Sequence, residues 1–180
     1  MSDGFRLPYS EAMKLAEKMV AILSPSCQRI EIAGSLRRKK ETIGDIEIVL
    51  IPRPMTDLFG DVLFGSIRIS SALAQEEFIL NKDGMYFKQV LPSDGGLGFD
   101  IFLTTPEKWG CVFTIRTGSA EFSHKLVTKR SMGGYCPSNL NFKDGRIWNG
   151  DQVLDTPEEK DVFDTLGMKW IEPNLRENVK

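Results

Sequence analysis

Hydrophobic residues recur at helical spacing near the start of the chain. Six apolar side chains fall at positions i, i+3, i+4, i+7, i+8 and i+11, which places them on one helical face; they are Ala12, Leu15, Ala16, Met19, Val20 and Leu23. Ser10 is a suitable N-cap residue, and Pro25 follows the last periodic position. The pattern therefore predicts a helix that ends before Pro25 and packs one face against a core.

Shorter apolar runs predict a sheet. The alternation over 28–34, the β-branched run 46–51 and the apolar segment 99–103 are each typical of a strand. Residues 81–84 supply turn chemistry between two further apolar segments, so a hairpin is expected there. Residues 57–75 have an ambiguous, moderately helical pattern.

The pattern changes after Thr104. A helix is predicted to begin at Ser119 and to end at Gly133 and Gly134. A hairpin is predicted around Asp144 and Gly145. A second helix is predicted to begin with a capping box of Thr156, Pro157 and Glu159. The expected fold class is α/β (α+β). A mixed β-sheet with flanking helices is expected over residues 1–106, followed by a small α+β subdomain over residues 107–180.

Composition narrows the class of protein. The 180 residues are 41% hydrophobic and 27% charged, close to the averages for soluble globular proteins. No apolar run reaches the roughly 20 residues that a membrane helix needs, and the start of the chain lacks the apolar core of a signal peptide. Three widely spaced cysteines predict reduced thiols, so we expect an intracellular, unsecreted protein. We also expect it to be a monomer without a membrane partner. A net charge of −2 argues against a generic polyanion binder.

Two carboxylates interrupt the apolar run that begins near residue 45. Side chains alternate along a strand, so Asp45 and Glu47 are expected on one side, about 7 Å apart, where they repel each other unless a cation lies between them. Asp100 is a third carboxylate among the apolar residues of 99–103. Mg²⁺ prefers hard oxygen ligands and is commonly shared between carboxylates and substrate phosphates. Three acids on neighbouring strands would hold two Mg²⁺ ions, with Mn²⁺ as a substitute.

A candidate phosphate site lies just upstream of these acids. Gly34 and Ser35 are expected to form a tight turn that presents backbone N–H groups and a hydroxyl, and Arg37 and Arg38 add bidentate donors for the same anion. Metal ligands next to phosphate donors indicate a nucleoside triphosphate site. Its chemistry would be in-line displacement at phosphorus with release of pyrophosphate.

The order of these motifs resembles that of the family X DNA polymerases, the DNA polymerase beta type of nucleotidyltransferase. The shared features are G-S-x-R-R, G-D-x-E, a downstream strand acid, T-G-S and the C-terminal segment LGMKWIEPNLRE. The resemblance covers nearly the whole chain. It implies a catalytic palm over 1–106 and a thumb-like nucleotide-selection subdomain over 107–180, in a minimal form without the lyase and helix-hairpin-helix domains.

The resemblance also implies roles for individual residues. Asp45 and Glu47 match the two acids that bind both metal ions. Asp100 matches the third acid, which binds the catalytic metal beside the primer 3′-hydroxyl and is a candidate base, so all three are expected to be catalytic metal ligands. The residues expected to contact the incoming nucleotide are Gly34, Ser35, Arg38, Gly44, Arg116, Thr117, Gly118, Ser119 and Ser123. A cationic helix is expected to contact DNA phosphates through Lys125, Lys129 and Arg130.

Several positions depart from the family pattern. Glu47 occupies a position where the family usually has Asp, which changes the reach of a metal ligand. Ile115 and Arg116 stand where many relatives have aromatic residues, Gly98 where relatives often have an arginine that orients the third acid, and Ser123 where many have an asparagine. These departures predict loose nucleotide selection.

The expected function is template-directed DNA polymerisation. A dNMP would pass from a dNTP to a primer 3′-hydroxyl in gapped or nicked DNA during repair, with modest fidelity and with a ligase or a repair complex as partner. A terminal transferase that needs no template and an RNA nucleotidyltransferase are alternatives on the same site. A catalytically silent nucleic-acid-binding module is an alternative of another class, and a small-molecule nucleotidyltransferase ranks lower because it lacks the C-terminal subdomain.

Overall fold

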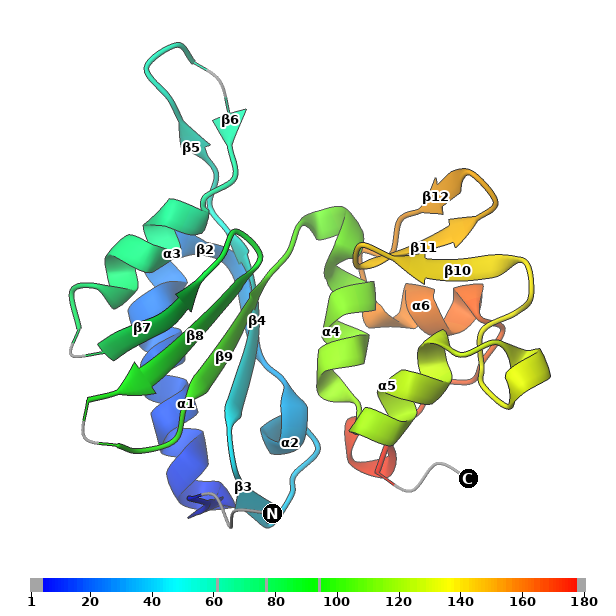
Figure 1. The fold of residues 1–180 in the computed structure, drawn as a ribbon, viewed down its shortest axis with the longest axis horizontal. Helices are drawn as coiled ribbons and strands as arrows, with labels where there is room; N and C mark the ends of the chain where they lie inside the picture. The colour runs from blue at the N-terminus through cyan, green and yellow to red at the C-terminus, as the bar shows by residue number, and fades with distance from the viewer. Residues whose placement is uncertain (1–4, 61, 77, 94, 178–180) are drawn as a thin grey trace. The chain divides into compact units, whose positions relative to one another are not determined.

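The chain folds into two compact units, Met1–Thr104 and Thr105–Lys180 (Figure 1). The structure is a computed structural model that describes residues 5–60, 62–76, 78–93 and 95–177. The boundary predicted after residue 106 lies close to this division. None of the helices in the described ranges combines the length and apolar character needed to cross a membrane.

The first unit is built on a five-stranded mixed sheet in the order β2-β4-β9-β8-β7 (Figure 1). Its strands are β2 (Cys27–Ile32), β4 (Ile46–Pro52), β7 (Phe78–Asp83), β8 (Phe87–Pro92) and β9 (Phe99–Leu103). β4 and β9 run parallel, and the other neighbouring strands run antiparallel. The strands and the hairpin expected from the sequence are present. The hairpin turn lies between Asp83 and Phe87 and not at residues 81–84 as predicted, because residues 81–83 continue β7.

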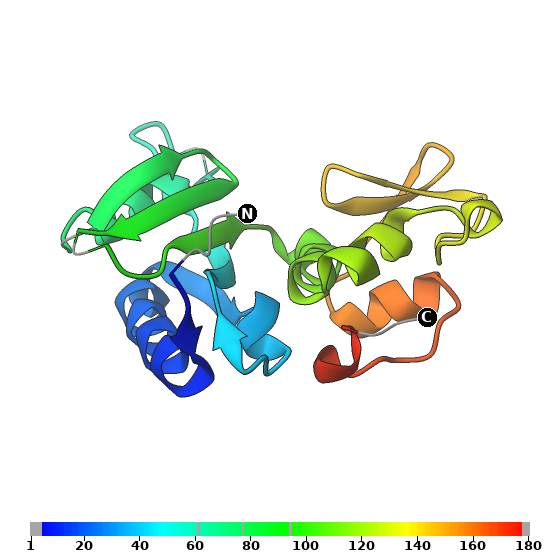
Figure 2. The same ribbon diagram turned by 60° about the horizontal axis from the view of Figure 1, so that its bottom comes forward.

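Two helices, α1 (Tyr9–Leu23) and α3 (Ser66–Leu73), cover one face of this sheet (Figures 1 and 2). Their apolar sides meet alternate strand residues in one core; its fully buried members include Ala12, Ala16, Leu23, Ile46, Ile48, Leu50, Ile69, Val90 and Ile101. Because Ile46, Ile48 and Leu50 face this core, Glu47 projects from the opposite face. Gln89 of β8 and Asp100 of β9 lie on the same face as Glu47, opposite this core.

The start of α1 differs from the prediction. The N-cap residue is Pro8 and not Ser10. A two-residue strand, β1 (Leu7–Pro8), pairs antiparallel with β3 (Thr42–Ile43). The Tyr9 backbone N–H then donates to Glu41 O at 3.0 Å, which fixes where the helix begins.

The ambiguous segment 57–75 is only partly helical. Its first part belongs to a short hairpin of β5 (Met55–Thr56) and β6 (Val62–Leu63), which projects beyond the sheet in Figure 1. Its second part is α3. The remaining element of this unit is the short helix α2 (Gly34–Arg37), which lies against β4.

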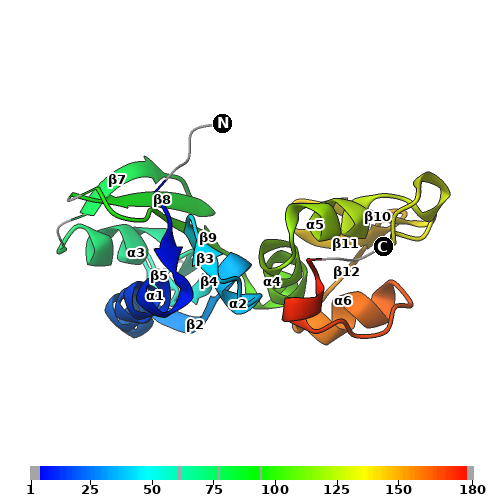
Figure 3. The ribbon, with the colours of Figure 1, turned by 90° about the horizontal axis from the view of Figure 1, so that it is seen from below.

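The second unit combines three helices with a small antiparallel sheet (Figure 3). Its elements are η2 (Pro106–Lys108), α4 (Trp109–Thr117), α5 (Ala120–Val127), η3 (Arg130–Met132), β10 (Leu140–Lys143), β11 (Arg146–Asn149), β12 (Gln152–Leu154), α6 (Glu159–Thr165) and η4 (Pro173–Leu175). Its core is separate from that of the first unit and contains Cys111, Phe122, Leu126, Cys136, Ile147, Val162, Phe163 and Leu166. The hairpin predicted around Asp144 and Gly145 joins β10 to β11, and both residues have positive φ.

Two helix boundaries in this unit differ from the prediction. Ser119 is the N-cap of α5 as expected, but the helix ends at Val127, and Gly133 instead ends the separate turn η3. The predicted capping box of Thr156 and Glu159 is wrong. The box that forms two residues later pairs Glu158 with Asp161.

Thr156 has a different role, which explains this shift. Its carbonyl accepts a hydrogen bond from Gly110 N at 2.7 Å, and its hydroxyl accepts one from Cys111 N at 3.3 Å. A Cβ on Gly110 would lie 2.1 Å from Glu158 O, so only glycine permits this approach of α4 to the chain before α6. Thr156 therefore anchors α4 and is not available to cap α6.

Candidate active site

The candidate site of the first unit lies where the parallel strands β4 and β9 begin. Glu47 and Asp100 are direct partners in the register of this pair, and both are half-buried. Paired residues on neighbouring strands project from the same face of the sheet. Asp45 is exposed and lies one residue before β4, in the connection from β3. The alternation argument thus holds for Glu47, but Asp45 is placed by the connection and not by a strand.

Gly34 fixes the position of the Glu47 side chain. Gly34 has φ +59, a left-handed conformation that favours glycine. A Cβ built at this position would lie 2.1 Å from Glu47 Oε2, so the Glu47 side chain packs directly against the start of α2. The Ala33 backbone N–H also donates to Glu47 O at 2.8 Å. The G-S motif therefore positions a candidate metal ligand as well as forming a turn.

Asp45 is in an environment that disfavours its charge. Desolvation by the surrounding protein is the largest cause that raises its pKa above the ordinary value, and the negative charge of Asp100 raises it further. Arg6 and Arg38 act in the opposite direction by smaller amounts. The residue remains solvent-exposed, so a ligand or ion in solution has access to this carboxylate.

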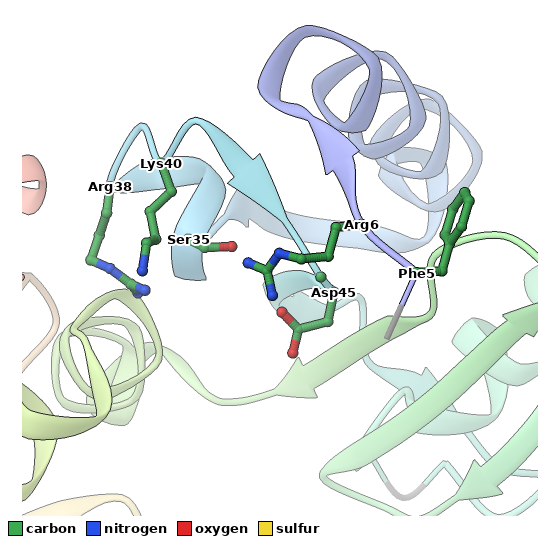
Figure 4. A pocket seen from close by; sticks show the side chains of 7 residues that line it. Phe5, Arg6, Ser35, Arg38, Lys40 and Asp45 are labelled. Carbon is green, nitrogen blue, oxygen red and sulfur yellow. The ribbon is translucent and has the colours of Figure 1, made fainter. Parts of the chain in front are cut away.

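A polar pocket of about 430 Å³ adjoins Asp45 (Figure 4). It is lined by Phe5, Arg6, Ser35, Arg38, Lys40, Gly44 and Asp45. Three cations against one carboxylate give the lining a positive balance, which suits a polyanion. Among the residues that the structure describes, the buried Ser35 Oγ has no hydrogen-bond partner, and such a group is normally satisfied by protein or ligand. The pocket lining therefore includes a hydroxyl whose hydrogen-bonding capacity is not used by the described residues.

Arg6 is a pocket residue that the sequence did not reveal. Its guanidinium donates to the Thr42 carbonyl at 3.0 Å, and a Cβ on Gly44 would lie 2.9 Å from its Nη1. The pairing of β1 with β3 brings it there from the start of the chain. No motif surrounds Arg6 in the sequence, so only the strand pairing identifies it.

The three acids predicted to bind metal do not form a closed cluster in the described residues. Within the described ranges, no three His, Cys, Asp or Glu side chains are gathered closely enough to hold a metal ion. The repulsion between Asp45 and Asp100, and the shared register of Glu47 and Asp100, nevertheless identify acids that a divalent cation would bring together. The donor set, three carboxylates beside a phosphate-type pocket, fits Mg²⁺.

In the second unit, the T-G-S motif is the junction between α4 and α5. Thr117 ends α4 and is fully buried, and Ser119 is buried as the N-cap of α5. The Ser119 hydroxyl accepts from Phe122 N at 3.1 Å and donates to Arg176 O at 2.8 Å. A Cβ on Gly118 would lie 2.4 Å from the Phe122 ring. In this structure the side chains of the motif shape the junction, and Gly118 is its part that is not buried.

The predicted DNA-contacting cations have different roles. Lys129 donates to the carbonyls of Ser138 and Leu140, and the Arg130 guanidinium donates to those of Tyr135 and Leu166. These two side chains thus hold the loop that precedes β10.

The other predicted residues of this region do not hold that loop. Lys125 forms an i,i+4 ion pair with Glu121 at 3.1 Å, and Arg116 is exposed at the end of α4. The Ser123 hydroxyl donates to Ile115 O at 2.6 Å, so it is engaged within the helix pair. Arg116 and Lys125 are therefore better placed than Lys129 or Arg130 for contact with a phosphate.

Two comparisons with known proteins bear on this arrangement. Residues 112–177 match the DNA polymerase beta thumb family. The chain is also 28% identical over 192 residues to DNA polymerase lambda from Rattus norvegicus, a match that covers 96% of this chain and 33% of that protein. The chain therefore spans about a third of the length of this relative.

Proposed function

We propose that this chain, a relative of the family X DNA polymerases, is a template-directed DNA polymerase that transfers dNMP from a dNTP to a primer 3′-hydroxyl and releases pyrophosphate. Short-gap filling in DNA repair is the role that we propose for it, with modest fidelity. The observation that carries the proposal is the polar pocket of the first unit. It places the buried Ser35 hydroxyl and the cations of Arg6, Arg38 and Lys40 beside the carboxylate of Asp45.

Each part of the pocket has a proposed task. Ser35 and Arg38 bind the triphosphate, because a hydroxyl and a guanidinium donate to phosphate oxygens. The backbone at Gly44 lies in the pocket lining and permits close approach of the phosphates. Arg6 adds a third donor from the start of the chain. These donors orient the α-phosphate for in-line attack.

The acids have the remaining tasks. Asp45, Glu47 and Asp100 would hold two Mg²⁺ ions, which when bound stabilise charge on the attacking and leaving oxygens. Gly34 keeps the Glu47 carboxylate at the start of α2, and Asp100 accepts the primer hydroxyl proton as candidate base. The longer Glu47 side chain, in place of the family's usual Asp, is accommodated because Gly34 presents no side chain to it.

The second unit supports a DNA polymerase over other nucleotidyltransferases. It matches the polymerase thumb family over most of its length, and a small-molecule nucleotidyltransferase has no need of such a domain. We propose that it selects the nucleotide through the T-G-S junction, including Gly118, and contacts DNA through Arg116 and Lys125. A terminal transferase or an RNA nucleotidyltransferase would use the same acids and pocket, so dependence on a templating base separates them.

Substitution of Ser35 by alanine tests the triphosphate site. Loss of a hydroxyl that has no protein partner among the described residues should leave the free energy of unfolding unchanged or slightly higher. The KM for dNTP should nevertheless rise about tenfold, since one hydrogen bond to a charged phosphate is lost. Ser71→Ala, an exposed serine of α3, is the matched control. An unchanged KM in Ser35→Ala, together with a normal Ser71→Ala control, contradicts a triphosphate in this pocket.

A further inference from the structure

A row of polar side chains crosses three neighbouring strands of the first unit and ends at the candidate base. Asn81 Nδ2 donates to Gln89 Oε1 at 2.6 Å, and Gln89 Nε2 donates to Asp100 Oδ1 at 3.0 Å. Gln89 and Asp100 are direct partners in the register of β8 and β9, which are adjacent in Figure 1. The row therefore runs from the edge strand β7 through β8 to the acid on β9.

Asn81 lies at a β-bulge of the edge strand β7. The register of β7 and β8 shifts between Leu80 and Lys82, so that Asn81 is the extra residue, while Lys82 pairs with Gln89. A bulge re-aims the side chain of the extra residue, and bulges are frequent next to active sites. Strand alternation from the Leu80–Val90 pair would by itself place Asn81 opposite Gln89. With the bulge, Lys82 takes the pairing position and Asn81 keeps its 2.6 Å contact with Gln89.

The carboxylate of Asp100 determines which group donates in each hydrogen bond of the row. An ionised carboxylate only accepts hydrogen bonds, so Gln89 must present its NH₂ group to Asp100 and its carbonyl oxygen to Asn81. Asn81 must then present its own NH₂ group to that oxygen. The orientation of a glutamine amide is ambiguous by itself, and here Asn81 removes the ambiguity. Gly98, two residues before Asp100, offers no side chain of its own to hold the acid.

We propose that Gln89 is a positioning residue for Asp100 and that Asn81 acts one step further out by holding the Gln89 amide in its donating orientation. This inference rests on the proposed function, in which Asp100 receives the primer hydroxyl proton. Gln89 holds Oδ1 with a neutral donor and leaves Oδ2 to the reacting groups. A displacement of about 1 Å at such a group costs about 100-fold in rate.

Asn81→Asp is the most informative variant, because Asn81 is exposed and does not touch the acid. An aspartate at this position cannot donate, so it attracts the NH₂ group of Gln89 and turns the carbonyl oxygen toward Asp100. We expect kcat for single-nucleotide addition to fall about tenfold, with KM for dNTP unchanged. Gln75→Glu, an exposed residue after α3, adds the same charge to the same unit and should leave kcat unchanged.

A double-mutant cycle separates this relay from a general effect of charge. Gln89→Met keeps the size of the side chain, removes the donor and should lower kcat by a similar factor. In the Gln89→Met background, Asn81→Asp should have no further effect, because the group that it acts on is gone. Additive losses in kcat, or an unchanged kcat in Asn81→Asp, would overturn the proposal.

A spectroscopic measurement keeps this inference distinct from the proposed function. In the ¹⁵N-labelled full chain, the side-chain amide signals of Gln89 should shift in Asn81→Asp and in Asp100→Asn, and should not shift in Gln75→Glu. This result needs no catalysis. Gln89 signals that ignore both substitutions overturn the inference even if the wild type is an active polymerase. If the Gln89 signals respond but the wild type extends no primer, the hydrogen-bonded row exists and the proposed function is rejected. The catalytic role of the row is then rejected with it.

Discussion

Gly34 shows how one residue connects the fold to the chemistry. Its φ of +59 and the 2.1 Å distance from a hypothetical Cβ to Glu47 Oε2 impose two separate constraints, one on the backbone and one on the neighbouring side chain. The positive φ is costly for any residue with a side chain. The contact with Glu47 is specific to this position, and a side chain here would displace a candidate metal ligand.

Gly34→Ala should therefore lower the stability of the first unit by more than the roughly 1–2 kcal/mol of left-handed strain, and should abolish nucleotide addition. Gly150→Ala is the matched control, since Gly150 has the same φ of +59 and nothing within 4 Å of a Cβ. Hydrogen exchange of the β4 amides measures the loss for Gly34→Ala. Tryptophan fluorescence during urea unfolding measures it for the control, because Gly150 lies in the unit that contains all three tryptophans. Equal losses in both variants, with activity retained, would show that the Glu47 contact has no effect.

The sequence indicated which side chains could carry chemistry, but it did not indicate what each side chain contacts in the fold. Asp45, Glu47 and Asp100 could be singled out because carboxylates are rare inside apolar runs. Lys129 and Arg130 were expected to face DNA because of their charge, yet both donate to backbone carbonyls of their own unit. A positive charge in a sequence does not reveal whether its partner is a phosphate or a carbonyl.

At the scale of elements, the hairpin of β7 and β8 is held to α3 by a buried lysine. Lys88 is 1% exposed and donates to Asp83, Ser70 Oγ and Gly84 O. The hydrogen bond from Lys88 is the main cause that lowers the pKa of Asp83. The charge of a buried lysine is tolerated only with such partners, so this contact fixes the turn end of the hairpin.

The two partners should respond unequally to substitution. Asp83→Asn leaves the Lys88 charge buried with a weaker partner, whereas Lys88→Met leaves Asp83 with a 45% exposed side chain that water can solvate. We expect Asp83→Asn to destabilise the first unit more than Lys88→Met does. Urea unfolding followed by circular dichroism measures both, and the reverse order would contradict this account of Lys88.

The same pair predicts a dependence of stability on pH. The pKa of Asp83 is lower in the folded state, so its stabilising contribution is present above the ordinary aspartate pKa and is lost as the pH falls through the folded value. Between about pH 5 and about pH 2, the wild type should thus lose more stability than Asp83→Asn. Parallel curves for the two proteins would exclude this contribution.

In the second unit, the C-terminal segment is anchored by a buried arginine. Arg176 is fully buried, and its Nη1 donates to Glu159 Oε1 at 3.0 Å. Its guanidinium lies 5.0 to 5.4 Å from three aromatic ring centres, those of Phe122, Phe163 and Trp170. An arginine in this setting combines an ion pair with stacking that a lysine cannot reproduce.

Arg176→Met should cost about 3–5 kcal/mol, because it leaves the Glu159 charge buried. The double variant Arg176→Met, Glu159→Met should be more stable than this single variant, since no charge remains buried. All three tryptophans, Trp109, Trp148 and Trp170, lie in this unit, so their fluorescence during urea unfolding measures it. A double variant less stable than the single one would contradict the ion-pair account.

A helix could be predicted from the sequence when one of its faces is exposed to solvent. The helix near the start of the chain was predicted because it is amphipathic, with one face in the core and one in water. α4 was not predicted, because WGCVFTIRT is buried on several sides and so lacks a polar face; its buried residues are Trp109, Gly110, Cys111, Phe113, Thr114 and Thr117. Periodicity gives no signal for an element of this kind.

At the scale of the whole molecule, the net charge of −2 means that the proposed DNA binding would depend on few local cations. The affinity for gapped DNA should therefore fall with salt, and Arg116→Ala should reduce the slope of log Kd against log salt by about 1. Lys129→Ala should leave this slope unchanged, because Lys129 holds carbonyls of its own unit. Binding titrations at several salt concentrations compare the two, and equal slopes for Arg116→Ala and the wild type would remove Arg116 from the interface.

The resemblance read from the sequence is supported at this scale by both comparisons, one on the second unit and one along nearly the whole chain. The acid on β9 could be singled out from the sequence because its strand is otherwise strongly apolar. Arg6, Gln89 and Asn81 could not, because strand pairing brings them to the site from distant positions. Such residues carry no local pattern.

The central claim is best tested by single-nucleotide extension of a labelled primer on a one-nucleotide gapped duplex. Each of the four dNTPs is supplied separately with Mg²⁺ or Mn²⁺, and Asp100→Asn serves as the control. The account predicts incorporation that follows the templating base and disappears in Asp100→Asn. Incorporation that ignores the template, or that persists in Asp100→Asn, would contradict it, as would the absence of any extension.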